Sequence, residues 1–332
     1  MINQLFCCYF PTKVVFVDDN KSFLKSMRPL LDDNIASYDF FDNPYNALDF
    51  INGIQGIDFL PSAFPARPHI DEELYKAIYS SRRYEEVSTV IVDYEMPGIK
   101  GLEFCEKLAN PYIRKILYTG VADETMAIEA FNNGIIDGYI RKKGPDQDVL
   151  VREFVIMSQL KYFKALSDVS IEVLLKKDIV YDNHRDAPFY DPMFIKYFNE
   201  LIKKNNISEY YFNDYIGGFV FLTSQGKTSA LYTLGSEIFD DVQSEFIITL
   251  KKEDAKNKRL ALLVKELEQE RKTICLPFQG NNQHPDARNW EEYAYPLDIV
   301  QGKNTYYVAY VPEVNYINSP DIFSFERYHR DR

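Results

Sequence analysis

The first half of the chain alternates short apolar runs with stretches whose apolar residues recur every three or four positions. Short apolar runs are typical of buried strands, and the three-to-four spacing is typical of amphipathic helices. Strands that alternate with helices in this way form a parallel sheet with helices on both faces. We therefore expect a doubly wound α/β domain over residues 1–150. Its predicted strands are KVVFV, ASYDFF, STVIVD, ILYTG and GYIRK.

The hydrophobic pattern changes after this domain. Apolar residues recur at helical spacing from Leu150 to Phe163, and we expect a long connector helix over residues 146–174. Residues 175–332 mix strand-like and helix-like segments, which predicts an α+β domain. Its predicted elements are a β-hairpin with strands at 219–223 and 228–234, strands at TICLPF and NTYYVAYVPEV, and helices at DPMFIKYFNELIKKN and 251–272.

Composition narrows the class of protein. The 332 residues exceed what one hydrophobic core usually serves, and 46% of them are hydrophobic, which is enough for two cores. The net charge of -12 opposes binding to phosphate backbones or anionic lipids, so we expect neither a nucleic acid nor a membrane partner. The four cysteines show neither metal spacing nor a disulfide framework, and no apolar run approaches the ~20 residues that span a bilayer. We therefore expect a cytoplasmic protein.

Polar residues follow the predicted parallel strands where the strands end. In such sheets the ligand site lies outside the carboxyl ends of the strands, so these residues should meet there. Three carboxylates in one pocket repel each other unless a cation lies among them, and oxygen ligands suit Mg²⁺. A lysine and a hydroxyl at the same edge would bind an anion that arrives with the metal, for which phosphate is the candidate. The residues are Asp18, Asp19, Asp93, Thr119 and the lysine pair Lys142 and Lys143.

Four segments in this order resemble the receiver domain of two-component response regulators over residues 12–150. They are VFVDDN, VIVDYEMPGIKGLEF, ILYTG and YIRKK. The resemblance implies a flavodoxin-like fold in which Asp93 accepts a phosphoryl group from a histidine kinase, with Mg²⁺ as the cofactor. Such a domain catalyses only its own phosphoryl transfer, which needs mainly positioning and charge neutralisation.

The resemblance also implies which residues hold the metal. Asp19 would coordinate Mg²⁺ directly, and Asp18 would take part beside it. The carboxylate of Asp93 and the backbone carbonyl of Glu95 would complete the set of metal ligands.

Three further residues receive roles from the resemblance. The hydroxyl of Thr119 would hydrogen-bond the phosphoryl oxygens, and the ammonium group of Lys142 would pair with them. Tyr139 would be the aromatic residue that, together with Thr119, changes position on activation.

Two features depart from the pattern of the receiver family. Lys143 replaces the family's usual proline after the lysine, which puts the backbone of that loop in question. Residues 53–86 contain an insertion, whose first part, GIQGIDFLPSAFPARPHID, is rich in turn-forming residues and whose second part, EELYKAIYSSRRYEE, is predicted to form a short helix. We expect the insertion at the surface. It is either a tolerated loop or an added contact area for choosing a kinase or covering the output domain.

The function of residues 175–332 is open between two classes. The first is a phosphorylation-controlled signalling protein, dimeric when phosphorylated, whose output domain binds an unidentified protein or small ligand. The alternative is a receiver-controlled enzyme or nucleotide-binding module, yet the segment GKTS lacks the first glycine of a P-loop and we find no catalytic motif. Direct transcription control comes third, because no helix-turn-helix signature is present. More loosely, the chain resembles the Legionella-type quorum-sensing response regulators, which carry an atypical output domain.

Overall fold

The computed structural model describes residues 4–54, 77–120, 124–142, 147–176, 188–213, 218–254, 260–276, 289–314 and 321–332. The chain divides into two compact units. The α/β unit comprises Phe10–Ala66, Lys76–Ser170 and Phe325–Arg332, and the antiparallel unit comprises Met1–Tyr9, Arg67–Tyr75 and Ile171–Ser324. The amino-terminal segment therefore belongs to the unit built mainly from the second half of the chain, and the carboxy-terminal segment belongs to the unit built mainly from the first half. The boundaries expected near residues 150 and 175 stay a prediction.

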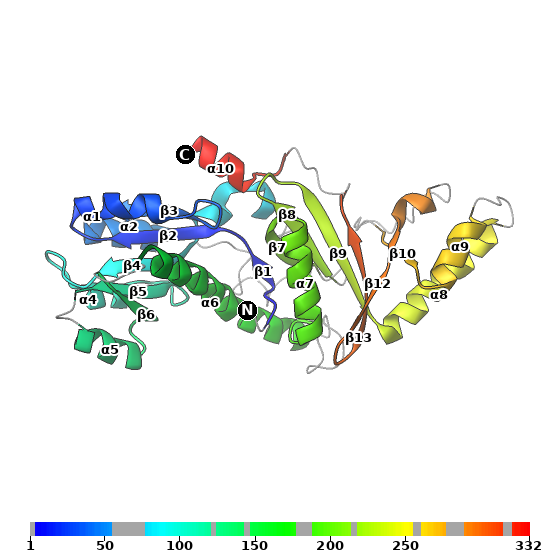
Figure 1. Ribbon diagram of the computed structural model, residues 1–332, viewed down its shortest axis with the longest axis horizontal. Coiled ribbons are helices and arrows are strands. Elements are labelled where there is room, and N and C mark those ends of the chain that lie inside the picture. The colour runs from blue at the N-terminus through cyan, green and yellow to red at the C-terminus, as the bar shows by residue number, and fades with distance from the viewer. Residues whose placement is uncertain are drawn as a thin grey trace. The chain divides into compact units, whose positions relative to one another are not determined.

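A five-stranded parallel sheet forms the centre of the α/β unit (Figure 1). Its strand order β3-β2-β4-β5-β6 is that of a flavodoxin-like fold, which confirms the predicted doubly wound domain. β2 and β4 are buried along their whole length, as expected of strands covered on both faces. The strands are β2 (Thr12–Val17), β3 (Ala36–Phe41), β4 (Val87–Asp93), β5 (Arg114–Thr119) and β6 (Gly138–Arg141).

Helices cover both faces of this sheet and form two separate cores. One core contains Leu48 of α2, Phe104 of α4 and Ala127 of α5, and the other contains Leu24 of α1 and Val155 of α6. The helices are α1 (Lys21–Met27), α2 (Pro44–Gly53), α4 (Gly101–Glu106), α5 (Glu124–Asn132) and α6 (Gln147–Lys176), with 3-10 turns η1 (Arg28–Leu30) and η3 (Ser81–Glu85). The 30-residue α6 confirms the predicted long helix, and its role as a connector stays a prediction. None of the described helices is long and apolar enough to cross a membrane.

Several of residues 77–86 are buried, which corrects, for these residues alone, the expectation of a surface position for the insertion. Its larger part, residues 55–76, lies outside the described residues. Arg83 and Tyr84 are both 0% exposed. The guanidinium group of Arg83 donates to the backbone carbonyls of Ala77, Ile78 and Ser80, at 3.0, 3.1 and 2.6 Å. These hydrogen bonds replace water around the buried cation, so that the segment can pack inside the unit.

The carboxy-terminal helix α10 (Phe325–Asp331) packs against this buried segment. The rings of Phe325 and Tyr328 lie 5.0 and 5.2 Å from the ring of Tyr84. The hydroxyl of Tyr328 donates to a carboxylate oxygen of Glu85 at 2.6 Å. Because Glu85 comes just before β4, α10 lies at the amino-terminal edge of the parallel sheet, opposite the edge at which β4 ends in Asp93.

The docking of α10 should weaken at acid pH. Burial lowers the pKa of His329, an effect to which the charge of Arg28 adds and which Asp33 opposes. A histidine with a lowered pKa binds fewer protons in the folded state, so its contribution to stability is full above about pH 6.5 and falls below that. We expect the thermal midpoint of the wild type to drop more between about pH 7.5 and 5.5 than that of His329→Phe. Equal drops of the thermal midpoint in the wild type and in His329→Phe would contradict this prediction.

A six-stranded antiparallel sheet forms the second unit, with strand order β1-β7-β8-β9-β13-β12. The predicted hairpin corresponds to β8 and β9, and the predicted strand NTYYVAYVPEV contains β13. The strands are β1 (Cys8–Tyr9), β7 (Ile207–Asn213), β8 (Gly218–Thr223), β9 (Thr228–Gly235), β12 (Asp298–Gln301) and β13 (Thr305–Val311). A separate pair is formed by β10 (Lys272–Ile274) and β11 (Ala294–Pro296). With its helices, this sheet confirms the predicted α+β class.

The helices of this unit differ from the prediction in one place. The segment DPMFIKYFNELIKKN contains α7 (Pro192–Lys204), as predicted. The single helix predicted over 251–272 is wrong, because the structure has α8 (Ser236–Asp254), α9 (Ala261–Glu268) and a 3-10 turn η5 (Trp290–Tyr293). Beyond α9, Glu270 has a positive φ of 52° and β10 begins at Lys272. Burial of Leu267 against the cluster that contains Leu250 and Trp290 determines where α9 lies.

Candidate functional site

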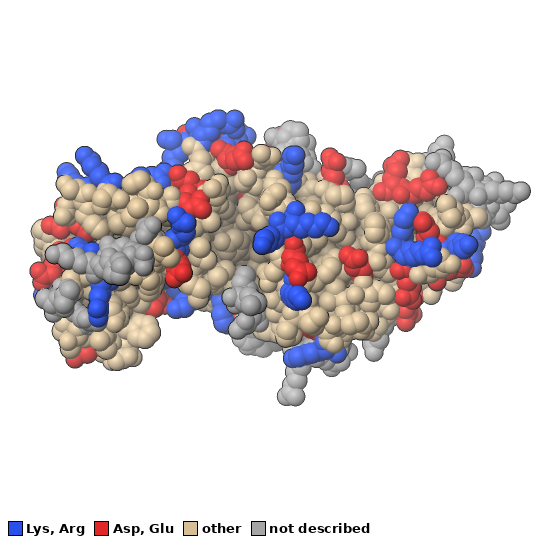
Figure 2. All heavy atoms as spheres, in the orientation of Figure 1, with Lys and Arg blue, Asp and Glu red and all other residues tan. Residues whose placement is uncertain are grey.

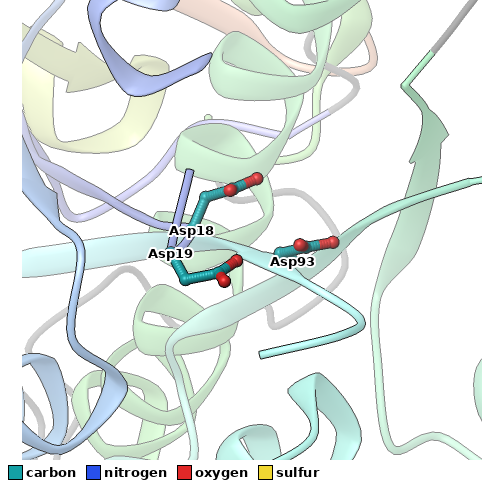
Figure 3. Close-up of side chains that lie close together, drawn as sticks. All are labelled: Asp18, Asp19 and Asp93. Carbon is teal, nitrogen blue, oxygen red and sulfur yellow. The ribbon is translucent and has the colours of Figure 1, made fainter. Parts of the chain in front are cut away.

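Three aspartates converge at the carboxyl ends of two neighbouring strands (Figure 3). Asp18 and Asp19 follow β2 directly, and Asp93 is the last residue of β4, which pairs with β2. One carboxylate oxygen of each lies within 4.8 Å of the others. Asp18 and Asp93 are buried, whereas Asp19 is exposed. In the strand order, β2 and β4 flank the point where the chain changes direction across the sheet, which is where such folds bind ligands.

Lys142 supplies the positive charge among these carboxylates. Its Nζ atom lies 2.8 Å from Asp18 Oδ2 and 2.7 Å from Asp93 Oδ2. Lys142 follows β6, and its backbone N–H donates to the carbonyl of Thr119 at 2.8 Å. A single ammonium group therefore bridges the two buried carboxylates.

The pKa values of this pair reflect burial and mutual attraction. Burial raises the pKa of Asp93, the hydrogen bond from Lys142 opposes this, and the nearby charge of Asp18 adds to it, so the net shift is upward. Burial lowers the pKa of Lys142, but hydrogen bonds to Asp18 and Asp93 outweigh it, and the net shift is again upward. Lys142 therefore stays charged, and the site would gain from a further cation.

Local hydrogen bonds orient the acidic pair. The carboxylate of Asp18 accepts the backbone N–H of Asn20 at 2.8 Å. The side chain of Asn20 in turn caps α1 by accepting the N–H groups of Ser22 and Phe23, both at 3.1 Å. The start of α1 therefore holds the turn after β2 in one conformation. Sequence reasoning missed Asn20, although an asparagine directly before a predicted helix is a recognisable cap.

The loop after Asp93 depends on two glycines. Gly98 has a φ of +86°, which other residues rarely adopt, and its carbonyl accepts the hydroxyl of Tyr45 at 3.0 Å. A Cβ atom on Gly101 would lie 2.3 Å from the backbone oxygen of Asp93. The backbone N–H of Glu95 in this loop donates to the carboxylate of Asp93. The contact of Tyr45 with this loop could not be predicted from the sequence, because α2 and the loop are distant in the chain.

The remaining predicted residues lie on neighbouring strands. Thr119 ends β5 and is buried, with its hydroxyl 3.2 Å from the carbonyl of Gly120. Its neighbour Tyr118 pairs with Asp93 across the sheet, which brings Thr119 to the edge where the aspartates lie. Tyr139 lies on β6, is half-buried and pairs with Leu117. The structure brings Asp18, Asp19, Asp93 and Lys142 into one cluster, and the roles of Thr119 and Tyr139 stay predictions.

The donor set at this edge fits a hard divalent cation. Mg²⁺ prefers carboxylate oxygens and keeps several water molecules. The aspartates supply only oxygen, and exposed Asp19 leaves one side of the cluster open to water. The pKa of Asp93 is raised first by its burial and further by the nearby charge of Asp18, both of which a bound cation would offset.

Comparisons with known proteins agree with this geometry. Residues 72–153 match the family described as the response regulator receiver domain. The structure is similar to that of the Legionella pneumophila response regulator LqsR, with 29% sequence identity, a TM-score of 0.75, and coverage of 98% of this chain and 96% of that chain. No curated protein matches the sequence.

Receiver domains are also among the similar structures. A CheY-like receiver domain protein from Methanospirillum hungatei JF-1 is 20% identical, with 47% of this chain and 98% of that chain covered and a TM-score of 0.32. The receiver family match, the flavodoxin-like strand order and the likeness to LqsR along the chain lead to one conclusion. The α/β unit is a response regulator receiver domain, and the chain as a whole is similar to a response regulator of the LqsR type.

Proposed function

We propose that this response regulator acts in a two-component phosphorelay, in which a histidine kinase phosphorylates Asp93 in the presence of Mg²⁺. The observation that carries the proposal is the cluster of Asp18, Asp19 and Asp93 around the ammonium group of Lys142. An anion can approach three carboxylates only when cations neutralise them. The cluster has the charges and the open side that such a transfer needs.

Each residue of the cluster has a part in the proposed transfer. The carboxylates of Asp18, Asp19 and Asp93, with the carbonyl of Glu95, would hold Mg²⁺, which when bound neutralises charge on the transferred group. Asp93 attacks phosphorus with one carboxylate oxygen. The new O–P bond forms as the P–N bond to the phosphohistidine of the kinase breaks in line with it, and the released imidazole takes a proton from water. Lys142 gives up its carboxylate partners and pairs with the phosphoryl oxygens.

Activation would then pass through neighbouring strands. The hydroxyl of Thr119 turns to hydrogen-bond the phosphoryl group, and the ring of Tyr139 moves into the space that this leaves. Such a change biases a two-state element close to the site. Tyr139 lies half-buried on β6, so its ring is in contact with solvent on one side.

The antiparallel unit is the output domain, and we infer that it binds a protein or a small ligand in the cytoplasm. The alternative is an enzyme or nucleotide-binding output, but the segment GKTS lies in the β8–β9 hairpin instead of between a strand and a helix. Transcription control through DNA is less well supported. On the face drawn in Figure 2, basic side chains lie among acidic ones, and Lys251 and Lys272 pair with Glu268 and Glu266.

The experiment that tests the receiver function is labelling of the full chain by acetyl phosphate, with and without Mg²⁺. Mass spectrometry then locates the acid-labile phosphoryl group.

Phosphorylation should also produce a homodimer. α5, next to the strand that carries Tyr139, exposes three large apolar side chains, Met126, Ile128 and Phe131, which are 45%, 43% and 50% exposed. Covering such side chains is favourable when a partner becomes available. We expect light scattering to show about twice the mass after treatment with acetyl phosphate and Mg²⁺. An unchanged mass over a wide range of concentrations would remove this proposal.

A further inference from the structure

The ammonium group of Lys142 has a third neighbour besides its two carboxylates. The ring of Phe23 on α1 has its centroid 5.3 Å from Nζ. A cation at this distance over an aromatic face is attracted by the negative face of the ring. Lys142 is therefore held by two ionic contacts, to Asp18 and Asp93, and by one aromatic contact.

Packing and capping hold Phe23 in place. Its ring lies 5.0 Å from the ring of Tyr118, which is 1% exposed and belongs to the strand that ends in Thr119. Its backbone N–H is bound by the capping side chain of Asn20. Phe23 also packs against the core that contains Val14 and Ile116. The ring is thus a fixed point beside a flexible lysine.

The three contacts of Lys142 would behave differently during the proposed transfer. Oxygen atoms of Asp18 and Asp93 are needed by the metal and for the attack on phosphorus, so Lys142 must leave them. The ring of Phe23 offers no oxygen to a metal and stays available throughout. A lysine has a flexible four-carbon stem, so its ammonium group would otherwise be free to turn into solvent between partners.

We propose that Phe23 is a positioning residue for Lys142, which keeps the ammonium group at the phosphoryl site while its carboxylate partners turn to the metal. This inference rests on the proposed function. Phe23 acts only through Lys142 and does not contact the phosphoryl group. Loss of the ring should therefore slow the transfer and leave metal binding unchanged.

Three variants test this role. Phe23→Leu keeps an apolar side chain but removes the aromatic ring, and Phe23→Tyr keeps an aromatic ring. Phe40→Leu is the matched control, because Phe40 is also a half-buried ring on the same core, stacked on Phe16 at 5.3 Å. At saturating Mg²⁺ we expect labelling by acetyl phosphate to be about two- to five-fold slower in Phe23→Leu. Phe23→Tyr and Phe40→Leu should remain within about two-fold of the wild type, and the Mg²⁺ concentration for half-maximal labelling should not change.

The proposal is overturned if Phe23→Leu reacts as fast as the wild type, if Phe23→Tyr is as slow as Phe23→Leu, or if Phe40→Leu is equally slow. A second measurement does not depend on phosphorylation. In the wild type, NMR should show the Lys142 side-chain methylene protons shifted upfield by the ring of Phe23, and the shift should persist when Mg²⁺ alone saturates the site.

This second measurement separates the two proposals. Absence of labelling with a persistent ring shift would reject the phosphotransfer and retain the contact between Phe23 and Lys142 on metal binding. Loss of the shift on adding Mg²⁺ would reject the role of Phe23, whatever the labelling shows.

Discussion

The Asp93→Asn chain is expected to take up no acid-labile phosphoryl group from acetyl phosphate, whereas the wild type takes up one in the presence of Mg²⁺. An amide cannot replace the carboxylate as nucleophile, so the effect is a complete loss. The wild type without Mg²⁺ should also remain unlabelled, because the buried carboxylates of Asp18 and Asp93 share one ammonium group and would repel the donor. Mass spectrometry of the intact chain and of its peptides measures both results.

The Asp93→Asn chain should remain folded, so an absence of labelling can be attributed to the lost carboxylate. The pKa of Asp93 is raised in the folded chain, first by burial, so its ionised form lowers stability at neutral pH. Replacing it with an uncharged amide of the same shape removes that cost. Asp33→Asn is the matched control, because Asp33 pairs with Arg28 at 2.7 Å in the same unit and stands before β3, at the sheet edge opposite the cluster. Full labelling of Asp93→Asn, or loss of labelling in Asp33→Asn, would contradict the assignment.

Gly101→Ala should destabilise the receiver unit and slow its labelling. The added Cβ would lie 2.3 Å from the backbone oxygen of Asp93 and 3.0 Å from both Leu117 Cδ1 and Tyr94 Cα. Two of these neighbours are backbone atoms, which cannot rotate away. Overpacking of this kind costs about 1–3 kcal/mol or more, and any relief would move Asp93 itself. Denaturant unfolding and the labelling rate are the two measurements.

Gly53→Ala is the control for this prediction. Gly53 ends α2, and a Cβ atom there meets nothing within 4 Å. Alanine should therefore be neutral or favourable at this position, since it restricts the unfolded chain more than glycine does. Equal stability of the Gly101→Ala and Gly53→Ala chains would show that the loop after β4 adapts without cost.

The receiver half could be predicted from the sequence because its signals are local. Each strand of the parallel sheet is a short apolar run, and each aspartate of the cluster stands at the end of such a run. Strand order in this fold class then brings Asp18, Asp19 and Asp93 together without further information. Lys142 could be placed at the same edge for the same reason.

The antiparallel half was less predictable because its strands pair over long distances. The hairpin of β8 and β9 is a local feature and was predicted, but β1 pairs with β7 from the far end of the sequence. The boundaries of α8 and α9 depend on burial of Leu250 and Leu267 in a shared cluster, which the mixed charges of the segment concealed. Only tertiary contacts decide such boundaries.

Apolar periodicity and the ordered strand-end motifs are enough to predict the receiver fold and its acidic site, because each strand and the polar residue at its end is a local signal, and the strand order of this fold class brings the ends of β2 and β4 together. Tertiary structure alone decides that α10 returns to the receiver unit, that Arg83 and Tyr84 are buried beneath it, and that Phe23 lies over Lys142. These contacts join segments that are distant in sequence, and each side chain by itself looks like an ordinary surface or core residue. Each of these side chains takes its role from the partner that folding brings close to it.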